Sequence, residues 1–209
     1  MELPLGDLYV LKAGGVFAAI ALVVVGRLRA HHPFTRFGPA NQITTFRALL
    51  VALVAGLVGD PGSPSLAASA VAASLLATIL DGVDGWLARR THMVSAFGAR
   101  FDMEVDALLI QVLAILVWQY GKAGPWVVLS GLLRYGFVAA GWLWPWMRRS
   151  LFPSVRRKTI CVVQIVGLML TILPAIAPPA SSLIAAASLA MLCYSFRVDT
   201  VWLWRRRAA

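Results

Sequence analysis

The chain contains 209 residues, of which 60% are hydrophobic and only 13% are charged. Because ordinary soluble domains carry about a quarter charged residues, this composition excludes a typical soluble domain and predicts a polytopic membrane protein. The formal net charge of +10 would suit a nucleic-acid-binding protein, but the basic residues are concentrated in loops between apolar segments, which argues against that class.

Seven apolar segments follow one another along the chain, and their lengths fit helices of about 20 residues that cross a bilayer core. The first runs from about residue 8 to residue 25 and is interrupted by Lys12. The next six are residues 41–58, 66–87, 98–120, 126–146, 159–173 and 183–204. Short loops with Gly, Pro and Ser separate them, without an internal repeat or a long linker. We therefore predict an all-α polytopic transmembrane helix bundle.

Alternate loops differ sharply in their content of Lys and Arg, which accumulate in cytoplasmic loops of membrane proteins. The stretches "RLRAHHPFTRF", "RRTHMVSAFGAR", "MRRSLFPSVRRK" and "RRR" are strongly basic, whereas "GDPGSPS", "YGKAGP" and "PAIAPPASS" contain a single Lys among them. This alternation predicts an outer N-terminus and a cytoplasmic C-terminus. The basic excess then reflects topology and attraction to anionic lipid, and we expect no nucleic-acid partner.

The first apolar segment has two interpretations. It spans the membrane with Lys12 reaching toward the outer interface, or it lies flat as an interfacial helix. The charge alternation favours the spanning helix.

Five of the nine carboxylates lie between Asp81 and Asp106. Asp81 and Asp84 are three residues apart near the end of the third segment, so they share a helix face. Asp102 and Asp106 are four residues apart at the start of the fourth segment and also share a face. Because the connecting loop is short, the two helices are predicted to be antiparallel neighbours. Four carboxylates then converge near the cytoplasmic membrane surface.

Such a group of carboxylates repels itself unless cations neutralise it. Carboxylate oxygens suit Mg²⁺ or Mn²⁺, and the number of ligands is sufficient for two ions. A pair of metal ions can stabilise both the attacking and the departing oxygen in a displacement at phosphorus. The sequence therefore predicts a metal site for phosphoryl chemistry.

Small residues and an arginine accompany the aspartates at fixed spacing. Gly85 and Gly98 leave space for a nucleotide or phosphate to approach the backbone, and Arg89 can meet phosphate oxygens. Together with Ala88, the pattern is D-x2-D-G-x2-A-R-x8-G-x3-D-x3-D, which fixes eight identities over 26 positions.

This stretch resembles the signature of the CDP-alcohol phosphatidyltransferase family at every position. The upstream stretch "PANQITTFRALL" is similar to the segment that precedes the signature, with Asn41, Thr44 and Arg47 at corresponding places. The resemblance begins near Asn41 and implies six core helices. We therefore expect residues 1–40 to form an additional N-terminal helix with a basic linker, and residues 41–209 to form the family's membrane domain.

The resemblance implies transfer of a phosphatidyl group from CDP-diacylglycerol to an alcohol, with release of CMP. By the same resemblance, Asp81, Asp84, Asp102 and Asp106 bind Mg²⁺ or Mn²⁺, and Asp106 also activates the acceptor hydroxyl. The donor would be bound by the remaining signature positions and the upstream residues, namely Gly85, Ala88, Arg89, Gly98, Asn41, Thr44 and Arg47. It also implies a homodimer. We expect an integral protein of a bacterial cytoplasmic membrane with its active site facing the cytoplasm.

Other interpretations of these residues stay open. The acids could form ion pairs with Arg89, Arg90 and Arg100, and Arg47 could be a snorkelling residue at a helix start. An ion-coupled transporter is the main alternative of another class, since membrane carboxylates also mark ion pathways. The acids lie at helix ends without a repeat, however, whereas transport sites favour interrupted helices at the membrane midplane.

The acceptor alcohol is the least determined part of the hypothesis. Glycerol 3-phosphate is our first expectation, followed by an inositol phosphate, while serine and choline remain alternatives. A phosphorylated acceptor would need cationic partners. The candidates are one arginine inside the fifth segment and four in the basic loop that follows it, namely Arg134, Arg148, Arg149, Arg156 and Arg157.

Overall fold

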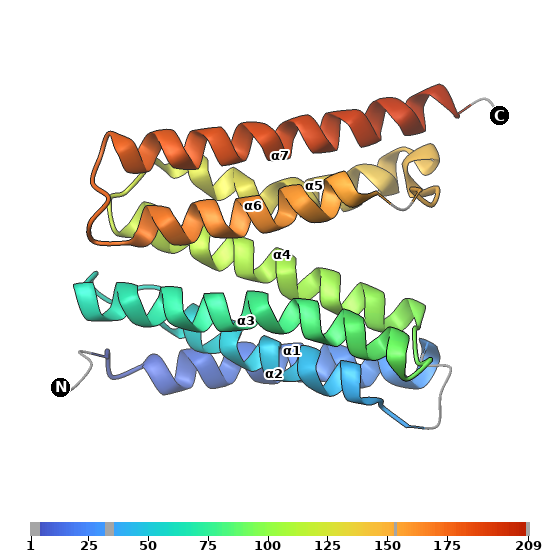
Figure 1. Ribbon diagram of the computed structural model, residues 1–209, viewed down its shortest axis with the longest axis horizontal. Helices are drawn as coiled ribbons and strands as arrows, with labels where there is room; N and C mark the ends of the chain where they lie inside the picture. Colours follow the sequence, from blue (N-terminus) through green and yellow to red (C-terminus); the bar gives the residue numbers. More distant parts are fainter. Residues whose placement is uncertain (1–4, 32–35, 153, 208–209) are drawn as a thin grey trace. The chain divides into compact units, whose positions relative to one another are not determined.

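The computed structural model describes residues 5–31, 36–152 and 154–207, and within these ranges all regular structure is helical (Figure 1). The chain divides into two compact units, residues 1–112 and 113–209, and the boundary falls inside one helix. The described residues form seven α-helices: α1 (Tyr9–His31), α2 (Pro39–Gly56), α3 (Pro64–Arg90), α4 (Ala96–Gln119), α5 (Leu129–Leu143), α6 (Val155–Ile172) and α7 (Ala180–Arg205).

Each of the seven predicted apolar segments corresponds to one of these α-helices, which confirms the all-α class. The boundaries differ at several places: α1 continues to His31, six residues beyond the predicted end, and α6 begins at Val155, four residues before the predicted start. Helix α3 continues three residues beyond the predicted end and so includes Arg89 and Arg90. The predicted fifth segment is divided into a short 3₁₀-helix (Pro125–Val128), α5 and a second 3₁₀-helix (Pro145–Arg148). Helix α5 ends before Pro145 because proline disfavours helical geometry in the residue that precedes it.

Four stretches of the described residues are long and apolar enough to cross a membrane, namely Tyr9–Leu28, Pro64–Arg90, Pro125–Leu143 and Ala180–Arg205. Helices α2, α4 and α6 fall outside this set, since each begins with polar or charged residues that shorten its apolar part. In α6 these are Arg156, Arg157 and Lys158 in the first turn. For these three helices, membrane crossing remains a prediction.

The first unit contains α1, α2, α3 and the first part of α4, which run alternately in opposite directions (Figure 1). Helix α2 packs against both α1 and α3, and its Ala48, Val51 and Ala52 are fully buried. Small residues bring α1 close: a Cβ at Gly56 would lie 2.9 Å from the Tyr9 ring. The start of α2 and α4 and the end of α3 lie at the same end of this unit.

Local sequence features define the start of α3 and the turn that joins α3 to α4. Helix α3 begins at Pro64 after the N-cap Ser63, whose hydroxyl accepts a hydrogen bond from the Leu66 amide. After α3 the chain turns at His92, which has a positive φ of 55°. Ser95 then accepts a hydrogen bond from the Gly98 amide at 3.0 Å and so satisfies one free N–H at the start of α4. A short turn therefore joins the two helices that carry the aspartates.

A polar clip joins α1 to the loop after α2. Lys12 Nζ lies 2.5 Å from Asp60 Oδ1 and donates to the Val58 carbonyl at 2.8 Å, and the Gly6 amide donates to Asp60 Oδ2 at 3.1 Å. The hydrogen bond from Lys12 is the main cause that holds the pKa of Asp60 below its ordinary value. Lys12, which interrupts the first apolar segment, thus has a buried carboxylate partner.

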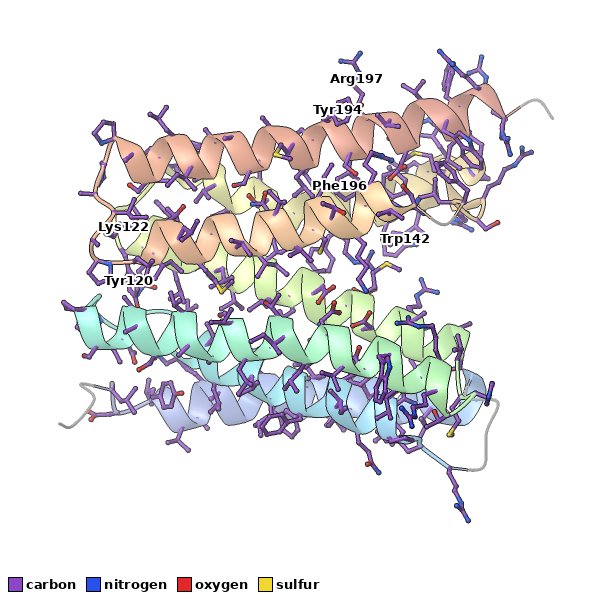
Figure 2. The ribbon with its side chains drawn as sticks, viewed as in Figure 1. Tyr120, Lys122, Trp142, Tyr194, Phe196 and Arg197 are labelled. Atoms are coloured by element: carbon purple, nitrogen blue, oxygen red, sulfur yellow. The ribbon has the colours of Figure 1, made fainter. Side chains whose placement is uncertain are left out.

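The second unit contains the end of α4 and helices α5, α6 and α7. Helices α6 and α7 pack closely, and a Cβ at Gly167 would lie 2.9 Å from the Ser188 side chain. The single Lys of the weakly basic loops, Lys122, donates to the carbonyls of Leu173 and Ile176 at 3.0 and 2.8 Å (Figure 2). This lysine therefore joins two loops of the unit rather than facing a ligand.

Replacement of Asp60 by Asn should weaken the clip, because Lys12 then loses its charged partner. Loss of a charged hydrogen bond costs about 1.5–3 kcal/mol, and for a chain of this size each kcal/mol lowers the melting temperature by about 2–4 °C. Thermal unfolding of the detergent-solubilised protein at neutral pH measures the effect, with the exposed Asp7→Asn as the matched control. Equal melting temperatures of the two variants would contradict the clip.

The clip should also depend on pH. Because the folded-state pKa of Asp60 is lowered, the wild-type stabilisation persists at neutral pH and is lost only as the pH falls below the ordinary aspartate range.

Candidate functional site

The four predicted aspartates meet in the first unit, where they surround one arginine. Asp81 and Asp84 lie in the last three turns of α3, and Asp102 and Asp106 lie in the first three turns of α4. We call these four residues the acid cluster. One carboxylate oxygen of each of Asp81, Asp102 and Asp106 lies within 4.8 Å of the others. The convergence predicted from the spacing is therefore present in the structure.

Arg47 of α2 forms ion pairs with all four carboxylates. Its side chain is only 1% exposed. Nη1 lies 2.7 Å from Asp84 Oδ2 and also donates to Asp102 Oδ1, while Nη2 lies 2.5 Å from Asp106 Oδ1 and 3.0 Å from Asp81 Oδ1. Nε donates to the Ala77 carbonyl at 3.0 Å. Arg47 thus points into the unit, and the interpretation of it as a snorkelling residue is wrong.

Thr44 lies one turn before Arg47 on the same face of α2. Its hydroxyl donates to Asp84 Oδ2 at 2.9 Å, and both residues are buried. Asp84 is therefore held by two side chains of α2, whereas Asp102 is 35% exposed and Asp106 is 21% exposed. The acid cluster has a buried side at Asp84 and a more open side on α4.

The charge of this site suits a divalent cation. Four carboxylates carry four negative charges and Arg47 carries one positive charge, so the formal charge is −3. Oxygens that bind Mg²⁺ at about 2.1 Å lie up to about 4.2 Å apart, close to the 4.8 Å limit seen for Asp81, Asp102 and Asp106. The donor set, made only of oxygens, fits a hard metal ion such as Mg²⁺ or Mn²⁺.

Gly98 permits a close approach between α4 and α2. A Cβ at this position would lie 2.9 Å from Asn41 Oδ1 and 3.2 Å from the Ser95 hydroxyl. Asn41 is buried, and its amide donates to the Phe37 carbonyl at 2.5 Å. The signature residue Gly98 and the upstream residue Asn41 are therefore in close contact with each other, and packing accounts for the glycine.

The other signature residues lie on α3 beside Asp84. A Cβ at Gly85 would meet only the Arg89 guanidinium, at 3.5 Å, so protein packing among the described residues does not explain this glycine. Ala88 is half-buried and Arg89 is exposed. Gly85, Ala88 and Arg89 thus form an accessible strip along α3 next to the acid cluster.

In the second unit, two of the candidate acceptor residues share one carboxylate. Arg156 Nη2 lies 2.5 Å from Asp199 Oδ1, and its Nη1 donates to the carbonyl and hydroxyl of Ser195, both at 2.8 Å. Arg157 Nη1 lies 3.7 Å from Asp199 Oδ1 and is buried without a hydrogen-bond partner among the described residues. Arg156 therefore links α6 to α7 by hydrogen bonds and an ion pair, while Nη1 of Arg157 can still donate a hydrogen bond.

The remaining candidate arginines are arranged differently. Arg148 donates from Nε to the Gly141 carbonyl at 2.6 Å, and Arg149 donates to the Arg206 carbonyl; both side chains are exposed. Arg134 is half-buried in α5. The five arginines thus do not share one ion-pair network within the described part of this unit.

Asp199 is the polar residue that sequence reasoning missed. It lies in α7, is 5% exposed at its side chain and pairs with Arg156. A buried charge inside an apolar helix is costly unless it is paired, so its position alone was a usable signal. No spacing pattern connects it to the arginines 42 and 43 residues earlier in the chain, Arg157 and Arg156.

Comparison with known proteins gives a consistent result. The model of a family described as CDP-alcohol phosphatidyltransferase matches residues 37–195, which leaves α1 outside the match. A Bacillus subtilis (strain 168) protein named CDP-diacylglycerol--glycerol-3-phosphate 3-phosphatidyltransferase is 32% identical over 77 residues, covering 37% of this chain and 40% of the relative. A Pseudomonas fluorescens protein of the same name is 38% identical over 98 residues, covering 46% and 48%.

An Arabidopsis thaliana protein named CDP-diacylglycerol--inositol 3-phosphatidyltransferase 1 is 40% identical over 63 residues, covering 30% of this chain and 26% of the relative. The chain thus matches less than half the length of each of these three relatives. No solved structure matches the chain.

The contact of Gly98 with Asn41 predicts a selective effect of added side chains. Gly98→Ala should force Asn41 away from its present position and destabilise the protein by about 1–3 kcal/mol, as overpacking does elsewhere. Gly82→Ala is the matched control, because a Cβ at Gly82, on α3 beside Asp81, meets nothing within 4 Å. Thermal unfolding of the two variants in detergent distinguishes them. If Gly98→Ala melts like Gly82→Ala, the close approach does not constrain α4.

Proposed function

The chain belongs to the CDP-alcohol phosphatidyltransferase family, and from this premise we propose that it transfers a phosphatidyl group from CDP-diacylglycerol to an alcohol, releasing CMP. The observation that carries the proposal is the acid cluster, in which the four signature aspartates converge on one site in the first unit. The relatives support the substrates by their names, which combine CDP-diacylglycerol with glycerol 3-phosphate or inositol.

Asp81, Asp84, Asp102 and Asp106 are the residues that would hold Mg²⁺ or Mn²⁺ in this proposal. The more open side of the acid cluster, at Asp102 and Asp106, is where ligands from solvent or substrate can enter. When bound, divalent ions neutralise negative charge that develops on the diphosphate during transfer. Two ions are proposed because four carboxylates supply enough oxygens for a pair.

Asp106 is proposed as the general base. Its carboxylate would accept the proton of the acceptor hydroxyl as the hydroxyl oxygen forms a bond to the phosphorus of the phosphatidyl group. The bond from that phosphorus to the bridging oxygen breaks, and CMP leaves with the electron pair. The 21% exposure of the Asp106 side chain supports this role, because the base must reach both the cluster and the incoming alcohol.

Arg89, with Gly85 and Ala88, is proposed to bind the CDP part of the donor. The accessible strip on α3 supports this, since an exposed guanidinium can form charge-assisted hydrogen bonds to phosphate. Asn41, Thr44 and Gly98 would then shape the site indirectly, because their polar groups or surfaces already contact protein. Arg47, the remaining donor-site candidate, has its guanidinium in the acid cluster.

Glycerol 3-phosphate is the acceptor that we propose first. Arg157 supports a phosphorylated alcohol, because its buried Nη1 has no hydrogen-bond partner among the described residues and matches a phosphate oxygen. An inositol phosphate is the second choice, while serine and choline are the unphosphorylated alternatives. Arg134, Arg148, Arg149 and Arg156 remain candidates for the same acceptor.

The apolar helices and the family fit an integral membrane protein. We propose a bacterial cytoplasmic membrane, a cytoplasmic active site and a homodimer, supported by the alternation of basic loops and by the family resemblance. Membership of a transferase family and the position of the acids at helix ends argue against an ion-coupled transporter.

Asp106→Asn should abolish most CMP release, because an amide cannot accept the hydroxyl proton; general-base loss typically costs about 10²–10⁴-fold. Purified protein is incubated with CDP-diacylglycerol, Mn²⁺ or Mg²⁺ and one alcohol at a time. Glu104→Gln, a carboxylate removal on the same helix but a different face, should retain most activity. Failure of the wild-type protein to bind the donor would contradict the transferase proposal, and undiminished turnover by Asp106→Asn would remove Asp106 as the base.

Arg157→Gln should raise the KM for glycerol 3-phosphate by about 10–100-fold, the equivalent of one charged hydrogen bond. The KM for CDP-diacylglycerol should stay within about twofold, since the substitution leaves the first unit intact. Arg197→Gln on α7 is the matched control, because this arginine is exposed and points away from the helices of its unit (Figure 2). Equal KM values for both variants would place the acceptor phosphate elsewhere.

A further inference from the structure

The guanidinium of Arg47 is surrounded by acceptors of the protein itself. Of its five N–H donors, Nε donates to a backbone carbonyl, Nη1 donates to Asp84 and Asp102, and Nη2 donates to Asp106 and also forms an ion pair with Asp81. Each of the four Nη contacts goes to a different carboxylate of the acid cluster. With 1% exposure, the side chain is also closed to solvent.

This geometry distinguishes Arg47 from a donor-binding arginine such as Arg89. To contact a diphosphate, Arg47 would have to release at least one carboxylate, and that exchange is costly for a guanidinium that is 1% exposed. Arg89 is exposed and can meet an anion without such a loss. The role of Arg47 must therefore be sought in the acid cluster itself.

A divalent ion and the Arg47 guanidinium would compete for the same four carboxylates. The guanidinium attracts one oxygen of each and reduces the negative potential that a metal ion experiences. Two cations within one small shell also repel each other, and burial strengthens this repulsion. Arg47 and metal ions should consequently weaken each other's binding to the acid cluster.

We propose that Arg47 is the internal counter-ion of the acid cluster and opposes divalent-metal binding, so that it sets the metal affinity of the site. This inference rests on the proposed function, because it requires that metal ions bind the acid cluster. Arg47 stabilises the four carboxylates in the absence of metal and reduces their affinity for it. It is a positioning residue, since it acts on the ligands and not on the reacting atoms.

Mn²⁺ binding to the full-length detergent-solubilised protein tests the proposal directly, without substrates. The free Mn²⁺ signal in electron paramagnetic resonance gives the dissociation constant for the wild type, Arg47→Gln and Arg100→Gln. Arg47→Gln should bind Mn²⁺ at least about 10-fold more tightly, because one positive charge leaves the ligand shell. Arg100→Gln removes the same charge from an exposed position on α4 and should change the constant by less than about twofold.

Equal or weaker Mn²⁺ binding by Arg47→Gln would overturn the proposal, and weaker binding would show that Arg47 helps to assemble the metal site. Thermal unfolding provides a second measurement, in which the melting temperature of each protein in a chelator is compared with its melting temperature in Mn²⁺. In a chelator, Arg47→Gln should melt below the wild type, and Mn²⁺ should raise its melting temperature by more than it raises that of the wild type. A smaller rise would also overturn the proposal.

Arg47→Lys serves if Arg47→Gln does not yield folded protein. It keeps one charge but cannot bridge four carboxylates, so its Mn²⁺ affinity should exceed that of the wild type by a smaller factor. Weaker binding by the Lys variant would contradict antagonism.

Asp102→Asn separates this inference from the proposed function. If Mn²⁺ binds the wild type and Asp102→Asn weakens it, the acid cluster is the metal site, and the Arg47 variants then decide the inference alone. If Asp102→Asn has no effect in the wild type or in Arg47→Gln, the metal assignment fails and the inference fails with it.

Discussion

The structure of the first unit depends on how four carboxylates are tolerated next to apolar helices. Ionised aspartates cannot be buried without cations, so the elements that carry them must also bring a positive charge to the same place. Helix α2 does this through Arg47, which contacts residues from both α3 and α4. The packing of three helices and the chemistry of the acid cluster are thus consequences of one electrostatic requirement. Thr44 adds a neutral hydrogen bond at Asp84, the most buried of the four carboxylates.

Helical geometry explains why these residues meet. Spacings of three and four residues put each pair of aspartates on one face of its helix, and the short turn at His92 reverses the chain between the pairs. Asn41, Thr44 and Arg47 follow one another at three-residue intervals on α2 and face the same region. Gly98 allows α4 to begin close to Asn41, which brings Asp102 and Asp106 within reach of the guanidinium. In the second unit, the buried charge of Asp199 is likewise compensated, by ion pairs with Arg156 and Arg157.

Much of this could be predicted from the sequence, because the determining signals are local. Apolar length predicted the seven helices, and the spacing of Asp81, Asp84, Asp102 and Asp106 predicted their convergence. The partners of buried charges could not be predicted in the same way. Arg47 is separated from the four aspartates by 34 to 59 residues, and Asp199 from Arg156 by 43. Such pairings depend on which helix faces meet, and periodicity does not determine this. The family resemblance assigned Arg47 and Gly98 to the donor site, and it did not indicate the ion pairs of Arg47 or the contact of Gly98 with Asn41.

The position of Asp199 has a consequence for the size of the folding unit. The family match ends at residue 195, whereas Asp199 and the fully buried Leu203 lie beyond it on α7. A protein trimmed to the matched residues would retain Arg156 and Arg157 in the first turn of α6 and lose their shared carboxylate. Two uncompensated arginines would then remain at the α6–α7 contact. The range matched by the family model is therefore shorter than the domain in which these buried charges have their partner. The last turns of α7 belong to that domain, although the family match does not include them.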